Sequence, residues 1–217
     1  MALAIFDLDE TLIHGDCASL WSEQMVRLGW VDGESFLRRD KELMDAYGRG
    51  HLAMEDYMAF SLEPLIGRTP AEVGHLVGPW VEDFIEPIIF SDATHTIAAH
   101  RKAGDRILVI SASGTHLVAP IAERLGIDEI LGIELEVVNG VYTGKTVGTL
   151  TYREGKITRL LEWLDQEEEN LEGASFYSDS RNDLPLLLKV DYPHVVNPDP
   201  VLREQAEKAG WPIHTWS

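Results

Sequence analysis

The chain has 217 residues, of which 45% are hydrophobic and 25% charged, a composition typical of a globular protein with a substantial core. Its 18 basic residues stand against 37 acidic ones, which gives a formal net charge of −19. Such a surface repels nucleic-acid phosphates and anionic lipids, so neither nucleic acid nor a membrane is an expected partner.

The sequence carries no pattern for membrane insertion or export. No apolar stretch approaches the ~18 residues of a membrane span. The N-terminus lacks the basic segment and the long apolar segment of a signal peptide. Cys17 is the single cysteine, so we expect a small buried residue and no internal disulfide. These features favour a cytoplasmic location. They predict no particular oligomeric state.

The first predicted element is a short buried strand over residues 3–7, whose apolar residues show little alternation, as in parallel sheets. Residues 17–90 then carry a helical pattern throughout. One helix is predicted to begin at Thr69, because T-P-A-E (69–72) is a capping box with proline at the first helical position. The helical stretch is therefore interpreted as an insertion after the first strand.

Beyond residue 90, strand and helix patterns alternate. Apolar strands are predicted at 107–110, 174–178 and 195–196, and a hairpin is predicted to turn at Asn139-Gly140. A helix over 154–166 leads into the strand at 174. This alternation predicts an α/β fold with a parallel sheet and helices on both faces.

Polar residues follow three of the predicted strands, and one lysine begins the helix before the third. They are Asp7 and Asp9, then Ser111 and Ser113 with Ala112 between them, then Asp179, Asn182 and Asp183, with Lys156 as the lysine. Ligands of open α/β sheets bind beyond the carboxyl ends of the strands. We therefore expect these residues to meet at one site.

The residue types suit a phosphate bound together with a metal ion. The carboxylates of Asp7, Asp179 and Asp183 are hard oxygen ligands of the kind that Mg²⁺ takes together with waters. Ser111, backbone N–H groups at 112–113 and Lys156 offer hydrogen bonds to phosphoryl oxygens. This set would supply the positive charge that an anionic substrate lacks on so acidic a surface.

Two carboxylates two residues apart can divide the chemistry between them. Asp7 can attack phosphorus, and Asp9 can protonate the leaving oxygen and then activate water. Taken singly, each residue has an ordinary structural explanation. A D-x-D pair, Ser111 or Asn182 can cap a helix, and Lys156 can be a solvated helix lysine. Their combination in four separate segments is what predicts phosphoryl transfer.

Four segments in order resemble the motifs of the haloacid dehalogenase-like phosphatases. They are D-L-D-E-T-L (7–12), V-I-S-A-S (109–113), G-K (155–156) and S-D-S-R-N-D (178–183). The hairpin E-L-E-V-V-N-G-V-Y-T-G (134–144) is similar to the phosphoserine phosphatase-like branch. The resemblance implies a Rossmann-like core formed by residues 1–15 and 90–217. It also implies that residues 16–89 form an all-helical cap.

The resemblance also implies a role for each matching residue. Asp7 would be the nucleophile that forms an aspartyl phosphate, and Asp9 the general acid and base. Mg²⁺ would be held by Asp7, the backbone carbonyl of Asp9 and Asp179, with support from Asp183. Phosphate and substrate would contact Ser111, Ala112, Lys156 and Asn182.

The substrate is less well determined than the chemistry. Asp16 stands where phosphoserine phosphatases carry a glutamate for the substrate's amino group, although it can equally cap the helix that follows. Residues 59–61 are A-F-S, where those enzymes carry the arginine that binds the substrate carboxylate. This favours an amino phosphate without a carboxylate. Relatives with a similar cap include histidinol-phosphate phosphatases, so the resemblance implies histidinol phosphate as the first choice. Phosphoserine is the alternative if Arg49 or Arg68 supplies the missing charge.

A second class of protein shares part of this pattern of residues. A phospho-accepting receiver domain of signalling proteins also places carboxylates at strand ends, but it is near ~120 residues and has no helical insertion.

His116, just beyond the second motif, is expected on a helix surface, with the active site as the alternative.

Overall fold

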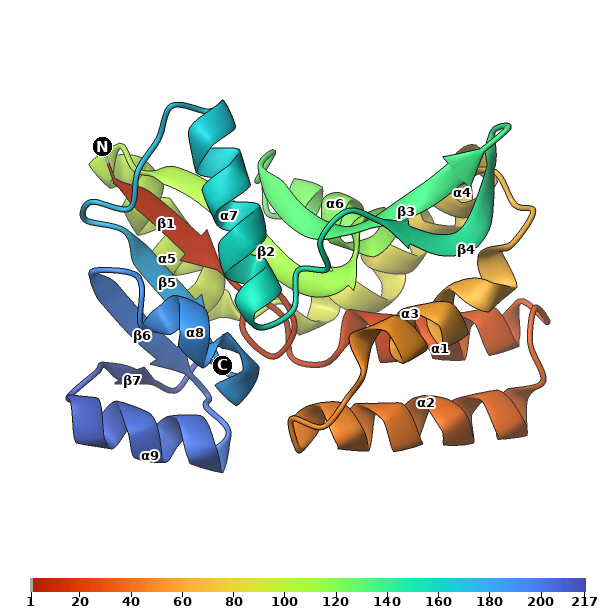
Figure 1. The fold of residues 1–217 in the computed structure, drawn as a ribbon, viewed down its shortest axis with the longest axis horizontal. Helices are drawn as coiled ribbons and strands as arrows, with labels where there is room; N and C mark the ends of the chain where they lie inside the picture. Colours follow the sequence, from red (N-terminus) through yellow and green to blue (C-terminus); the bar gives the residue numbers. More distant parts are fainter. Residues whose placement is uncertain (1) are drawn as a thin grey trace.

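The computed structural model describes residues 2–217, and within them a sheet of seven strands runs in the order β4-β3-β2-β1-β5-β6-β7 (Figure 1). The strands are β1 (Leu3–Phe6), β2 (Arg106–Gly114), β3 (Ile130–Val138), β4 (Val141–Val147), β5 (Ser175–Ser178), β6 (Tyr192–Val196) and β7 (Ile213–His214). All neighbouring strands pair in parallel except β3 and β4, which form the predicted hairpin.

Strand β1 occupies the middle of the sheet, between β2 and β5. Ile5 lies opposite Leu108 on one side and Phe176 on the other. The strand order therefore reverses direction at β1, which is where open α/β sheets bind their ligands. The residues directly after β1 are the two aspartates that the sequence singled out.

Helices cover both faces of the sheet, as predicted. On one face lie α7 (Glu154–Gln166), α8 (Leu184–Leu187) and α9 (Pro200–Ala209), and on the other α5 (Ser91–Ala103) and α6 (Thr115–Arg124). Side chains alternate along β1, so Ile5 packs with the first group and Phe6 with the second. All four β1 residues are buried, which explains why the strand has no polar position.

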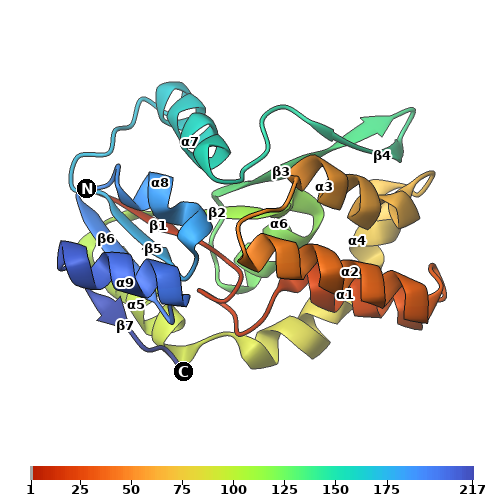
Figure 2. The same ribbon diagram turned by 60° about the horizontal axis from the view of Figure 1, so that its bottom comes forward.

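The inserted segment is helical, as the sequence indicated. It comprises α1 (Cys17–Arg27), α2 (Gly33–Gly48), α3 (Met54–Leu62) and α4 (Pro70–Trp80), with short turns η1 (Glu63–Leu65), η2 (Val81–Ile85) and η3 (Glu86–Ile88). The capping box at Thr69 and Glu72 is present. Helices α1 and α2 lie side by side below the hairpin (Figures 1 and 2). Their apolar residues belong to the same buried cluster as α5 and α6. The Rossmann-like α/β fold is confirmed, whereas the division into core and cap stays a prediction.

Three details differ from the predicted elements. Strand β2 continues past Ile110 to Gly114, because Gly114 still pairs with Ile133 of β3 after a shift in register. Asn182, which was considered as a helix cap, lies instead inside a short turn, η4 (Arg181–Asp183), and α8 follows that turn. Strand β7 was not predicted, since two residues carry no recognisable pattern. In residues 2–217 no helix is long and apolar enough to cross a membrane.

Candidate active site

The predicted residues converge at the carboxyl ends of β1, β2 and β5. Asp7 follows β1 and is only 5% exposed. Its Oδ1 accepts a hydrogen bond from Lys156 Nζ at 2.8 Å, and the same ammonium lies 2.8 Å from Asp183. Lys156 begins α7, so the N-terminal turn of this helix brings a buried cation to the strand end. Ser178 Oγ also donates a hydrogen bond to Asp183, at 2.7 Å.

Burial and charge determine the protonation of this cluster. Burial, opposed by Lys156, raises the pKa of Asp7 to about 7, and the neighbouring Asp183 contributes to the rise. Burial, followed by repulsion from Asp7, raises the pKa of Asp179 well above its usual value. Burial alone would lower the pKa of Lys156, but Asp183 and Asp7 outweigh it and hold that pKa above its ordinary value. The cluster therefore keeps its ammonium and still carries more carboxylates than cations.

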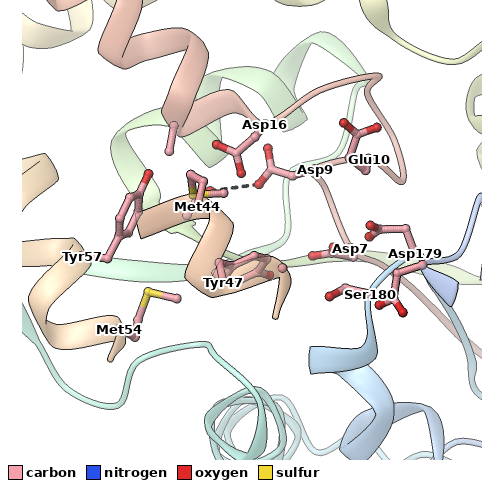
Figure 3. A pocket seen from close by; sticks show the side chains of 15 residues that line it. Asp7, Asp9, Glu10, Asp16, Met44, Tyr47, Met54, Tyr57, Asp179 and Ser180 are labelled. Atoms are coloured by element: carbon pink, nitrogen blue, oxygen red, sulfur yellow. Dashed lines mark hydrogen bonds between the residues drawn. The ribbon is translucent and has the colours of Figure 1, made fainter. Parts of the chain in front are cut away.

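This excess of carboxylates fits a divalent cation. Asp179 lies beside Asp7 (Figure 3), and its Oδ1 accepts a hydrogen bond from the buried Thr11 at 3.2 Å. Within residues 2–217 no three His, Cys, Asp or Glu side chains already form a closed metal site. Mg²⁺ does not require one, because it takes one or two carboxylates and completes its shell with waters and substrate phosphate. Asp7 and Asp179, together with the backbone carbonyl of Asp9, are the groups that would hold it.

Asp9 is turned into a different set of contacts. Its Oδ1 accepts a hydrogen bond from the backbone N–H of Cys17 at 2.7 Å, and its Oδ2 accepts one from Ser113 Oγ at 2.9 Å. Ser111 Oγ lies farther from Oδ2, at 3.4 Å. The two aspartates of the D-x-D pair thus face different partners, as a division between nucleophile and proton carrier requires.

The residues predicted to contact phosphate lie around this centre at different depths. Ala112 and Ser113 line the cavity, whereas Ser111 is fully buried behind them. The Oγ of Ser111 accepts a hydrogen bond from the backbone N–H of Ser113 at 3.0 Å. Ser111 therefore braces the end of β2 in this structure. Ser113 was expected to offer only its backbone N–H group to phosphate, and its hydroxyl contact with Asp9 was not predicted.

Asn182 links the sheet to the inserted helices. Its Nδ2 donates to the carbonyl of Tyr47 at 3.3 Å, and its Oδ1 accepts from Arg153 Nε at 3.2 Å. Arg153 also donates to the carbonyl of Gly50. These bonds tie the end of α2 and the loop after it to the turn that carries Asp183. Asn182 thereby fixes the position of Tyr47 in the cavity wall.

Asp16 shows both of the features that the sequence left open. It caps α1, since its Oδ1 accepts from the backbone N–H of Ser19 at 2.7 Å. It also lines the cavity next to Asp9 (Figure 3). Burial, and secondly the charge of Asp9, raise the pKa of Asp16 to about 8. Because burial and Asp9 disfavour the ionised form of Asp16, a cation placed beside this carboxyl would stabilise its ionised form.

A cavity of about 260 Å³ joins the strand ends to the inserted helices. Among the described residues that line it, six carry carboxylates and none is Lys or Arg: Asp7, Asp9, Glu10, Asp16, Asp179 and Asp199. The inserted helices contribute five side chains that sequence reasoning did not assign to the site: Ala18, Met44, Tyr47, Met54 and Tyr57. Helical periodicity marks such residues as buried, but it carries no signal that they border a cavity.

The two arginines considered for a substrate carboxylate lie elsewhere. Arg68 stacks over the ring of Trp30, 3.6 Å from its centroid, and donates from Nε to the carbonyl of Pro64. Arg49 is exposed at the end of α2. The expectation that His116 lies on a helix surface is wrong. Its Nδ1 atom is buried beside a small second cavity.

The comparisons with known proteins agree with this geometry. Residues 4–188 match the family model of the haloacid dehalogenase-like hydrolases, and the chain belongs to that family. A histidinol-phosphatase of Neisseria meningitidis serogroup C is 37% identical over 97% of both chains. The phosphoserine phosphatase SerB1 of Mycobacterium tuberculosis is 30% identical over 98% of this chain and 70% of its own length.

A solved structure is also similar over nearly the whole chain. A protein of unknown function from Bordetella pertussis Tohama I superposes with a TM-score of 0.91 and is 35% identical, covering 98% of this chain and 97% of that one. The predictions of the family and of a phosphatase enzyme are thereby confirmed.

Proposed function

We propose that the protein is a Mg²⁺-dependent phosphomonoesterase that acts through an aspartyl phosphate on a small phosphate ester carrying an amino group, with histidinol phosphate as the best candidate. The observation that carries the proposal is the lining of the cavity. Asp7 lines the cavity and is paired with Lys156, which lies outside the lining, whereas the lining itself carries the Asp16 carboxyl and no Lys or Arg side chain.

The residues divide the reaction as follows. Lys156 binds Oδ1 of Asp7, so we assign the attack on phosphorus to Oδ2. The P–O bond to the alcohol breaks as the Asp7–phosphorus bond forms, and Asp9 gives its proton to the leaving oxygen. Asp9 then takes a proton from water, whose oxygen displaces Asp7 and releases phosphate. A bound Mg²⁺ would neutralise phosphoryl charge beside Asp7 and Asp179.

The surroundings of Asp9 suit a carboxyl that exchanges a proton. The bond from the Cys17 N–H holds Oδ1, while Oδ2 has a hydroxyl partner in Ser113 that can rotate as the charge changes. We include Ser111, Ala112 and Asn182 in the phosphate and substrate contacts, and Asp183 in the support of the metal site. The helical residues 16–89 would act as a cap that encloses the reaction.

The acidic lining supports an amine and disfavours a carboxylate. A substrate ammonium can pair with Asp16, whereas the carboxylate of phosphoserine would enter a cavity whose charged lining groups are all carboxylates. The 37% identical histidinol-phosphatase supports the same choice.

The test is a comparison of kcat/KM for histidinol phosphate and phosphoserine with the purified protein, in Mg²⁺ and in EDTA. We expect a preference for histidinol phosphate of 100-fold or more, with turnover abolished by EDTA. Higher kcat/KM on phosphoserine would overturn the substrate, and one phosphoryl group accepted without turnover would indicate a receiver-like protein. Full activity of Asp7→Asn would overturn the mechanism.

A further inference from the structure

One buried hydroxyl in the cavity wall has no partner in the described chain. Tyr57, on α3, is 4% exposed, and its Oη atom is fully enclosed without a hydrogen bond. Leaving such a group unsatisfied is unfavourable, because the hydroxyl loses its hydrogen bonds to water and gains none in exchange. Buried polar groups of this kind are rare in folded proteins and call for a ligand or a water.

Tyr57 stands at the end of the cavity away from Asp7, where the proposed function places the alcohol part of a substrate. It lies with Met54 at the opposite end from Asp7 and Asp179, and Asp16 lies between (Figure 3). Met44 and Met54 add apolar thioether side chains to this end. The space is therefore shaped for a mostly apolar group that carries a hydrogen-bonding atom.

The charges around Tyr57 select the kind of group that it can bind. Burial, and next the charge of Asp16, raise the pKa of Tyr57 well above its usual value, so the hydroxyl remains a neutral donor and acceptor. A carboxylate placed beside it would be repelled by Asp16 and would find no cation in the lining. A neutral ring nitrogen carries no such penalty.

We propose that Tyr57 is a specificity-determining residue whose hydroxyl hydrogen-bonds a neutral heterocyclic nitrogen of the substrate, while Asp16 binds the ammonium. This deepens the proposed function and rests on it. It defines the substrate class as phosphate esters of amino alcohols that carry an uncharged, flat nitrogen ring, of which imidazole is the case to be tested.

A second use of the hydroxyl must be separated from this one. Tyr57 also borders a cavity of about 20 Å³ together with His116, whose Nδ1 is likewise buried without a partner. That volume holds about one water molecule. If a water there were the partner of Tyr57, the hydroxyl would serve the fold and would not distinguish between substrates.

The experiment compares two substrates that share the ammonium and differ in the ring. For Tyr57→Phe with Mg²⁺, we expect kcat/KM on histidinol phosphate to fall at least 10-fold, mainly through KM, and kcat/KM on ethanolamine phosphate to change less than 2-fold. Asp16→Asn should lower both. Tyr142→Phe, which alters another buried tyrosine outside the cavity lining, is the matched control and should lower neither.

The outcomes separate the two proposals. An unchanged ratio of the two kcat/KM values in Tyr57→Phe, with histidinol phosphate still preferred by the wild type, overturns the role of Tyr57 alone. A wild-type protein that does not hydrolyse histidinol phosphate overturns both.

Discussion

Replacing Lys156 by Met tests whether the buried ammonium holds the carboxylate cluster together. Lys156 is 1% exposed and lies 2.8 Å from both Asp7 and Asp183. With an effective dielectric constant of about 20, each contact is worth about 6 kcal/mol before the cost of desolvation is subtracted. Methionine keeps the aliphatic stem but removes the charge, so two buried carboxylates lose their cation. Removing one partner of a buried ion pair costs about 3–5 kcal/mol, which is the loss of unfolding free energy expected here.

The assay is urea unfolding in EDTA, followed by circular dichroism. Lys102→Met, at an exposed lysine of α5, is the control and should change stability by less than about 0.5 kcal/mol. The double variant Lys156→Met/Asp183→Asn should recover part of the loss, because it removes one of the two stranded charges. A loss below about 1 kcal/mol in Lys156→Met would refute the reasoning.

The pH dependence of that loss has a definite sign. Burial already raises the pKa of Asp7 to about 7 with Lys156 present, and removal of the ammonium raises it further. The unfolded chain has a carboxyl pKa near the ordinary value of 3.8, so the folded state binds more protons between the two values. Stability therefore falls as pH rises through this window. The Lys156→Met deficit should be larger at pH 8 than at pH 4.5.

The remaining predictions concern groups around the site. Ser113→Ala removes the hydroxyl that lies 2.9 Å from Asp9, and we expect kcat to fall about 10-fold with KM nearly unchanged, as measured by steady-state kinetics. Arg153→Met frees the loop after α2, and we expect KM to rise several-fold and amide exchange at residues 48–52 to quicken; unchanged exchange would contradict the tie to Gly50. Burial lowers the pKa of His116 to about 4 from an ordinary 6.5, so the unfolded state binds the extra proton and stability falls as pH drops through this window. Between pH 7 and pH 5 this contributes a loss of about 2 kcal/mol, which should be absent in His116→Phe when unfolding is followed at both values.

Local patterns were sufficient for most of the fold. The apolar run of β1, the capping box at Thr69 and the Asn139-Gly140 turn each depend on interactions between near neighbours in the chain. The turn has positive φ at both central residues, as the twist of a tight hairpin requires. Such features can be predicted from a sequence because the interactions that cause them lie within a few residues of each other.

The positions of the inserted side chains could not be derived in that way. Tyr47 and Tyr57 enter the cavity because Asn182 holds the end of α2 and because α3 packs against the β3–β4 hairpin. These contacts join residues far apart in the chain. The same holds for Arg68. The sequence left it open as a residue that binds a substrate carboxylate, but in the structure it stacks on Trp30, outside the cavity lining.

The sequence by itself determined the family, the α/β architecture and the two aspartates after β1, since four short motifs at strand ends suffice to specify them. Only the tertiary structure decided how those groups are used. It buried Lys156 between Asp7 and Asp183, turned Asp9 toward Ser113, and let Asp16 cap α1 while facing the cavity. The physical reason is that desolvation and through-space charge, which set protonation and substrate preference, depend on which distant residues fold against each other.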